Sequence, residues 1–162
     1  MVIFNFKKLP DDIIFEVKQF IIFKPKCKQE LEKAIKIYNR DIHISKQIHG
    51  DISLWDTSNI TDMSYLFDYM TTFNGDISRW NTSNVTDMYF MFADANNFNQ
   101  PIGMWNTSNV TNMNGMFASA KIFNQPIGMW NVSNVNNMSY MFVGAKSFNQ
   151  PIGMWNVSNV RH

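Results

Sequence analysis

Five tryptophans recur at a spacing of 25 residues, and this spacing limits the possible folds more than any other feature of the chain. They are Trp55, Trp80, Trp105, Trp130 and Trp155. Self-similarity at a fixed period of roughly 20 to 50 residues is typical of repeat proteins, in which each unit packs only against its neighbours. We therefore expect equivalent side chains to form columns along one axis and to build one continuous hydrophobic core.

The apolar positions within one repeat predict two short elements. From Val85 through Met88 and Met91 to Ala95 the step is three or four residues, which is typical of a short helix or 3₁₀ segment. From Phe98 to Trp105 the pattern is that of a short parallel strand. The predicted fold class is a repeat solenoid with one short parallel strand and one short helix or 3₁₀ segment per 25-residue coil, and with an α-helical N-terminal cap.

The polar positions of the repeat are predicted to be structural. Every copy has Ser-Asn after the tryptophan, and short polar side chains at a corner can satisfy backbone groups from one copy to the next. A threonine or asparagine two residues after that asparagine, such as Thr86, occupies the position of a helix N-cap. The methionines within the repeat are predicted to fill the core between aromatic rings.

The N-terminal part differs in composition and predicts a separate helical module. Residues 1–50 contain ten Lys and Arg and no tryptophan. An amphipathic helix is expected over about 27–39, with Leu31, Ala34, Ile35 and Tyr38 on one side, and an earlier one is expected after Leu9-Pro10. We therefore divide the chain into a helical cap, 1–47, and a solenoid, 48–162, of about 4.5 repeats with the last one incomplete.

The repeat resembles a known family. The string Phe-Asn-Gln-Pro-Ile-Gly-Met-Trp-Asn, followed by Ser-Asn-Val, Met and Met-Phe in register, resembles the BspA-like leucine-rich repeat family over roughly residues 48–160. That family occurs in bacterial surface proteins and in proteins of large DNA viruses of protists. The resemblance implies a leucine-rich-repeat-like solenoid used for adhesion or protein binding, with no catalytic residues to carry over. A viral origin and a surface adhesin are among its implications.

The start of the chain also resembles an F-box, the helical module that docks substrate receptors onto ubiquitin ligases. The matching stretch is Leu-Pro-Asp-Asp-Ile-Ile from residue 9 onward, and the later part of the motif is not recognisable. This resemblance implies an adaptor-binding face made of Leu9, Pro10, Ile13, Ile14 and Val17. A substrate-receptor subunit of a ubiquitin ligase is therefore the alternative function.

Charge and composition argue against several other functions. Seven Asp and one Arg lie in residues 51–94, whereas residues 95–162 have three Lys or Arg and no acidic side chain, so no face concentrates enough positive charge for nucleic acid. The polar residues recur as columns, which is typical of a scaffold and not of an enzyme with one activated nucleophile. We expect no enzyme activity and no cofactor.

Metal binding and membrane insertion are not expected either. One cysteine and three histidines leave few metal ligands, and calcium at Asp51, Asp62, Asp76 and Asp87 is the alternative considered, although later copies replace these aspartates. Neither a membrane span nor a signal peptide is recognised, so a cytoplasmic protein is expected, in the host cytoplasm if it is viral.

The variable positions of the repeat are the candidate partner-binding residues. A residue next to an inward tryptophan is expected to point outward, so exposed methionines would form an adaptable apolar contact surface. The candidates are Met104, Met129, Met154, Arg79, Leu54 and Tyr89. We therefore expect a non-enzymatic protein-binding module. The incomplete last repeat also suggests an end-to-end homodimer through an uncapped C-terminal coil.

Overall fold

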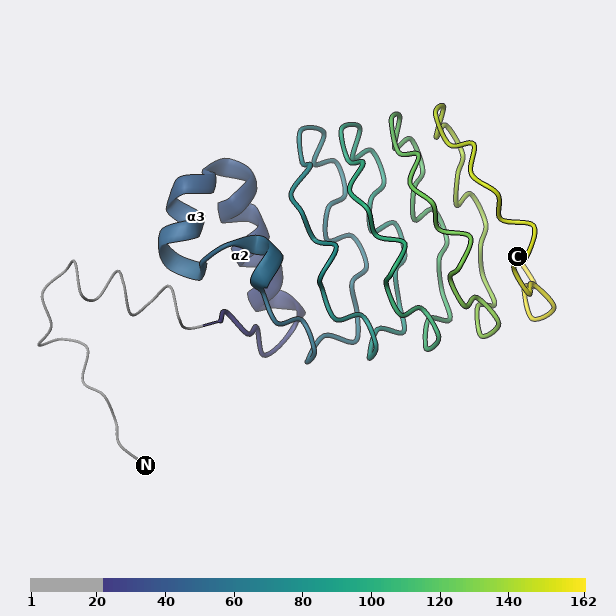
Figure 1. Cartoon of the computed structure of the whole chain (residues 1–162), viewed down its shortest axis with the longest axis horizontal. Coiled ribbons are helices and arrows are strands. Elements are labelled where there is room, and N and C mark those ends of the chain that lie inside the picture. The colour runs from purple at the N-terminus through teal and green to yellow at the C-terminus, as the bar shows by residue number, and fades with distance from the viewer. Residues whose placement is uncertain (1–21) are drawn as a thin grey trace, which may run out of the picture.

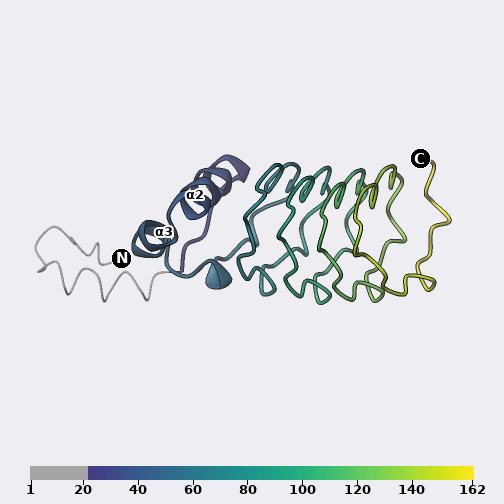
Figure 2. The same ribbon diagram turned by 90° about the horizontal axis from the view of Figure 1, so that it is seen from above.

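The computed structural model describes residues 22–162, which form a short helical region followed by a stack of irregular coils (Figure 1). The helices are α2 (Lys28–Arg40) and α3 (Ile42–His49), and a 3₁₀ helix, η2 (Ile52–Leu54), follows them. We number the coils by the sequence repeat: coil 1 (51–75), coil 2 (76–100), coil 3 (101–125), coil 4 (126–150) and the partial coil 5 (151–162). Figure 2 shows the helices at one end of the stack.

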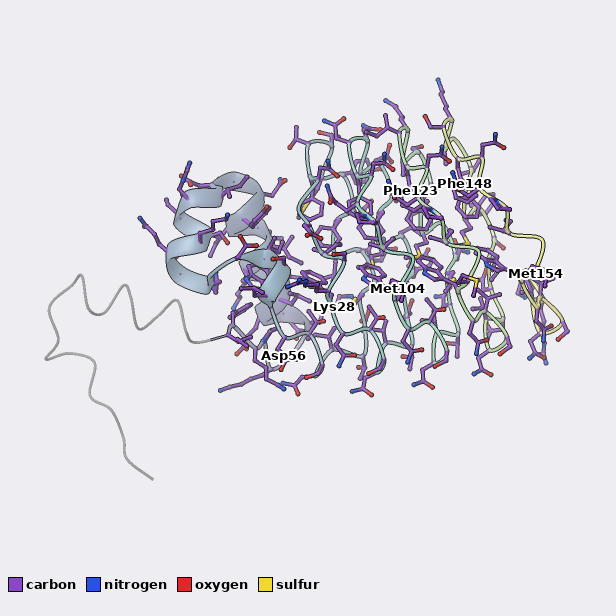
Figure 3. The ribbon with its side chains drawn as sticks, in the orientation of Figure 1. Lys28, Asp56, Met104, Phe123, Phe148 and Met154 are labelled. Carbon is purple, nitrogen blue, oxygen red and sulfur yellow. The ribbon has the colours of Figure 1, made fainter. Side chains whose placement is uncertain are left out.

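Equivalent aromatic side chains lie over one another from coil to coil, as the spacing predicts. The ring centroids of Phe92 and Phe117 are 5.6 Å apart with an interplanar angle of 2°, and those of Trp105 and Trp130 are 6.5 Å apart. The first four tryptophans are at most 4% exposed. Phe123 and Phe148, labelled in Figure 3, continue a second phenylalanine column with centroids 6.0 Å apart. The prediction of a continuous core of like residues is therefore confirmed.

The backbone of the stack is held by hydrogen bonds that do not form a sheet. In coil 1, the amides of Met63, Tyr65, Phe67 and Tyr69 donate to carbonyls of coil 2, while the amides of Leu66, Asp68 and Met70 donate three residues back within their own coil. The same alternation recurs in coils 2 and 3. Parallel pairing is limited to isolated bridges at Asp62–Asp87, Asp87–Asn112 and Asn112–Asn137. Backbone groups are thus paired without a continuous strand.

The predicted leucine-rich-repeat-like solenoid, with a strand and a short helix in every coil, is wrong for the residues that the structure describes. The segment expected to be helical contains left-handed residues at two positions in each of coils 1 to 4, for example Tyr65 (φ 60°) and Tyr69 (φ 57°) in coil 1. A right-handed helix cannot include such residues, so the segment folds as successive turns. Thr86 is accordingly not an N-cap; its amide donates to the Thr61 carbonyl of the preceding coil.

The expected strand is a turn for a different reason. The Trp105 amide donates to the carbonyl of Ile102, three residues earlier, and Pro101 has no amide hydrogen to offer a ladder. In coil 1 the equivalent residues are the 3₁₀ helix η2. The Ile102 carbonyl also accepts from the indole of Trp130, at 3.1 Å. Side chains therefore take part in the pairing that a strand would supply.

The predicted Ser-Asn ladder is confirmed. The side-chain amide of Asn109 donates to the Ser83 carbonyl at 2.7 Å, and Asn84, Asn134 and Asn159 make the same bond to the preceding coil. The asparagine supplies its side chain, whereas the serine supplies its backbone carbonyl. The ladder fixes the register of one coil on the next.

The predicted amphipathic helix over 27–39 is confirmed as α2, and it covers the first coil. Leu31, Ala34 and Ile35 are at most 1% exposed and belong to the same core as Trp55. Lys28, labelled in Figure 3, lies 3.0 Å from the Asp62 carboxylate and also donates to Ser64. No helix within residues 22–162 has the length and apolar character needed to cross a membrane.

Candidate binding surface

Three methionines are the most exposed large apolar side chains in the described residues. Met104, Met129 and Met154 are 91%, 92% and 92% exposed, and they occupy the same position in coils 3, 4 and 5. We call these three residues the methionine strip. Met104 and Met154 lie along the long axis of the stack in Figure 3. The sequence-based expectation that the residue before each buried tryptophan points outward holds, although the backbone there is a turn and not a strand.

Close contact between successive coils determines which residues of this turn are exposed. The glycine before each of its first two methionines packs against the next coil: a Cβ at Gly103 would lie 2.3 Å from the Pro126 carbonyl oxygen, and one at Gly128 would lie 2.5 Å from that of Pro151. Only glycine allows this approach. The turn therefore sits directly on its neighbour, and the methionine that follows projects into solvent.

The other predicted contact residues lie on the first two coils. Leu54 is 53% exposed, and together with the exposed Arg79 it lines a hollow of about 310 Å³ next to Trp55. Leu54 and Arg79 occupy the position of the methionine strip in coils 1 and 2. Five of the six predicted residues thus occupy one position of the repeat, which holds Leu54 and Arg79 in the first two coils and methionine in the last three.

Tyr89, the sixth predicted residue, lies at a different position of the repeat in an aromatic cluster. Its ring centroid is 5.1 Å from that of Tyr65 and 4.7 Å from that of Phe90. Tyr65 is 50% exposed, whereas Tyr89 and Phe90 are half-buried. The Phe90 ring covers Gly115, where a Cβ would lie 2.4 Å from the ring.

The sequence pattern gives no role to Tyr65 and Phe90, although a signal exists. Position 65 corresponds to Phe90, Gly115 and Tyr140 in the later coils, and all four residues have positive φ. A glycine in a column otherwise filled by aromatic residues indicates a left-handed backbone, and this would have predicted turns at these positions.

Most carboxylates of the first coil are paired with lysines. Asp56 lies 2.7 Å from Lys24, and this hydrogen bond, with those from Ser58, lowers its pKa to about 2. Asp51 is paired with Lys46 at 2.9 Å and Asp62 with Lys28. In residues 22–162 no group of three or more His, Cys, Asp or Glu side chains is arranged to hold a metal ion.

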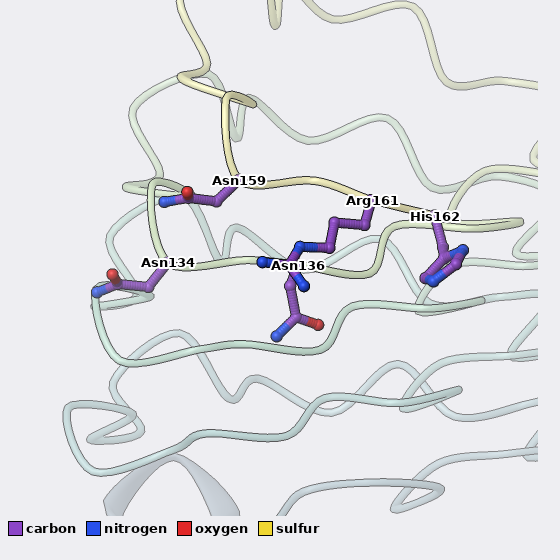
Figure 4. A pocket seen from close by; sticks show the side chains of 5 residues that line it. All are labelled: Asn134, Asn136, Asn159, Arg161 and His162. Carbon is purple, nitrogen blue, oxygen red and sulfur yellow. The ribbon is translucent and has the colours of Figure 1, made fainter.

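A hollow of about 500 Å³ lies on the last coil. Figure 4 shows its lining, with Asn159, Arg161 and His162 on the last segment and Asn134 and Asn136 on the coil before it. The side chains of Asn134 and Asn159 already donate to carbonyls of the preceding coils, so these amides are committed to the stack. The end-to-end dimer stays a prediction.

Stacked 25-residue coils behind a helical cap, with an exposed methionine at one position of coils 3, 4 and 5, define the class of protein. The chain belongs to the family described as "Mycoplasma protein of unknown function, DUF285", whose model matches residues 37–155. No curated protein matches the chain, and no solved structure does. The BspA-like resemblance stays a prediction. So does the F-box alternative, because Leu9, Pro10, Ile13, Ile14 and Val17 lie outside the described residues.

Proposed function

We propose that this protein is a non-enzymatic protein-binding module that contacts its partner through the methionine strip. The observation that carries the proposal is the exposure of Met104, Met129 and Met154, each above 90%, at one position of successive coils. Six other methionines of the coils, by contrast, are at most 4% exposed. A regular row of exposed apolar side chains is unfavourable in water and is typical of a contact surface.

The chemistry of the methionine strip favours an apolar partner surface. Covering one fully exposed methionine side chain contributes roughly 1.5 to 3 kcal/mol, and the flexible thioether adapts to partners of different shape. Residues 95–162 contain no acidic side chain and only Lys121, Lys146 and Arg161 as fixed cations. Charge therefore contributes little to recognition at this surface, and packing of apolar groups contributes most.

Site-specific photocrosslinking in the native cell tests the proposal. A photoreactive amino acid at position 129 should trap a protein partner, and the same group at the exposed Lys121 serves as the control. Replacing Met104 and Met154 by Ser should reduce crosslinking at position 129 at least about tenfold, because apolar contacts are lost on both sides. The melting temperature should change by no more than about 2 °C, since these side chains are exposed.

Two results would contradict the proposal. One is equal crosslinking from positions 121 and 129, which would indicate random collision. The other is crosslinking at position 129 that is unchanged in the Met104→Ser, Met154→Ser variant, which would show that the neighbouring methionines do not contact the partner.

A further inference from the structure

A second surface, exposed at Tyr65 and half-buried at its other residues, lies on coils 1 and 2 at a different position of the repeat from the methionine strip. It combines the aromatic cluster of Tyr65, Tyr89 and Phe90 with carboxylates on the same turns, and we call it the acidic-aromatic surface. Its carboxylates are Asp68, Asp87 and Asp94. Tyr65 and Asp68 are joined by a turn in which the Asp68 amide donates to the Tyr65 carbonyl at 3.2 Å. The Tyr69 amide donates to the Ala93 carbonyl at 2.9 Å, which brings Asp94 beside this turn.

The ionisable groups of this surface also affect one another's pKa values. The pKa of Asp68 is raised first by partial burial and then by the charge of Asp94. The pKa of the Tyr65 hydroxyl is raised first by the Tyr89 hydroxyl, then by loss of hydration, and also by the charges of Asp68 and Asp87. Negative charge therefore acts on the exposed Tyr65 side chain.

The lysines of the helical region do not neutralise this charge. The ion pairs among the described residues join Lys24 to Asp56, Lys28 to Glu32 and Asp62, and Lys46 to Asp51. Within residues 22–162, Asp68, Asp87 and Asp94 have no cationic partner within 4.0 Å. The Asp68 and Asp94 carboxylates, on adjacent coils, repel each other, and a cation bound between them would relieve that repulsion.

An arginine side chain is well suited to bind where aromatic faces lie next to unpaired carboxylates. A guanidinium group stacks on an aromatic ring and donates two parallel hydrogen bonds to a carboxylate, whereas an ammonium group is a more strongly hydrated point charge. Tyr65 offers an exposed ring, and Asp68 and Asp94 offer carboxylates on the adjacent turns. An apolar partner would leave these carboxylates buried and unpaired, which is costly.

We propose that the acidic-aromatic surface binds an arginine-bearing segment of a partner protein, with the guanidinium group between the Tyr65–Tyr89 rings and the Asp68 and Asp94 carboxylates. This binding uses none of the residues of the methionine strip. It goes beyond the proposed function, and either surface can be disproved without the other.

The test uses the full chain and two short peptides that differ in one charged group. An acetylated and amidated Gly-Arg-Gly-Arg-Gly peptide is compared with its counterpart in which citrulline, neutral and nearly isosteric, replaces arginine. The arginine peptide should shift the NMR resonances of Tyr65 and Tyr89 at low ionic strength, and the citrulline peptide should not. Raising the salt concentration to about 0.5 M should weaken binding of the arginine peptide several-fold, because salt screens the attraction between exposed charges.

Variants separate binding from folding. Asp68→Asn and Asp94→Asn should each weaken binding of the arginine peptide about three- to tenfold, as expected for the loss of one half-buried charge pair. Asp76→Asn is the matched control, since Asp76 is exposed, belongs to no ion pair among the described residues and uses its carboxylate to accept from the Ser78 amide. Asp68→Asn should not lower the melting temperature, because it removes a repulsion.

Equal shifts with the citrulline peptide would overturn the proposal, because charge would then play no part. Unchanged affinity in both Asp68→Asn and Asp94→Asn would overturn it as well, and so would an equal loss in Asp76→Asn, which would indicate only a general attraction to the acidic half of the stack. Failure of the methionine-strip experiment would leave all these measurements interpretable.

Discussion

The indole nitrogen of Trp80 donates a 2.9 Å hydrogen bond to the carbonyl oxygen of Ile52, which lies 28 residues earlier in the chain. Trp105, Trp130 and Trp155 repeat this bond to the isoleucine of the preceding coil. Trp55, in coil 1, lacks such a partner among the described residues and packs instead against Phe23 and His49. Each tryptophan after the first therefore both packs in the core and donates a hydrogen bond to the preceding coil.

Removing one of these indoles should destabilise the stack. Trp130→Phe takes the indole donor from the Ile102 carbonyl and leaves unfilled volume in the core, so we expect a loss of about 2 to 4 kcal/mol in the free energy of unfolding. Trp155→Phe is the control, since Trp155 is only half-buried and its bond is 3.3 Å long. Urea unfolding should show less than half the effect there, and equal losses would contradict the inferred role.

A single methyl group between coils should have a position-dependent effect. Gly128→Ala would place its Cβ 2.5 Å from a backbone oxygen of coil 5, whereas Gly153, at the same position one coil later, has nothing within 4 Å. We expect Gly128→Ala to destabilise by about 1 to 3 kcal/mol through overpacking. Gly153→Ala should change stability by less than about 0.5 kcal/mol. Similar melting temperatures for the two variants would show that the coils do not approach so closely.

The column of positive-φ residues Tyr65, Phe90, Gly115 and Tyr140 predicts an unusual preference for glycine. Tyr140 is 68% exposed and has a φ of 58°. Tyr140→Gly should therefore be more stable than Tyr140→Ala by about 1 kcal/mol, because alanine keeps the left-handed strain and glycine removes it. At the exposed Lys121, which does not have positive φ, the order should reverse and alanine should be better. Thermal unfolding of the four variants measures both differences. The same order at both sites would rule out the left-handed turn.

Stability should fall on acidification because of one half-buried histidine. Burial lowers the pKa of His49 from 6.5, and its ring lies 4.4 Å from Phe23 and 5.7 Å from Trp55. The unfolded state then binds more protons than the folded state below about pH 7, so the stabilising effect of neutral His49 is present above the unfolded pKa and is lost as pH falls through the lower folded value.

His49→Phe should flatten the dependence of melting temperature on pH between 7.5 and 5. His43→Asn, on the exposed side of the same helix α3, should leave the dependence as in the wild type. A slope that His49→Phe does not change would assign the acid sensitivity to other groups. The Asp56 carboxylate, whose pKa is lowered to about 2, should affect stability only at still lower pH, from about pH 4 downward.

The sequence by itself determined the columns. Strict recurrence of Trp, Phe and Asn every 25 residues means that each coil meets its neighbour with like residues opposite, so the core, the Ser-Asn ladder and the outward position of Met104, Met129 and Met154 follow from the pattern. The amphipathic helix α2 follows as well, because its apolar spacing and its place before the first coil are local properties of the chain.

Only the tertiary structure decided the backbone within a coil and the second surface. A spacing of three or four residues is shared by a helix and by successive turns, and the difference lies in whether the amides of Met63 and Tyr65 pair within the segment or with the next coil. That choice places Tyr65 and Phe90 in the left-handed region, exposes the Tyr65 ring, lays the Phe90 ring over Gly115 and places Asp68 where the charge of Asp94 acts on it. These contacts join residues about one repeat apart, so local periodicity contains no information about them.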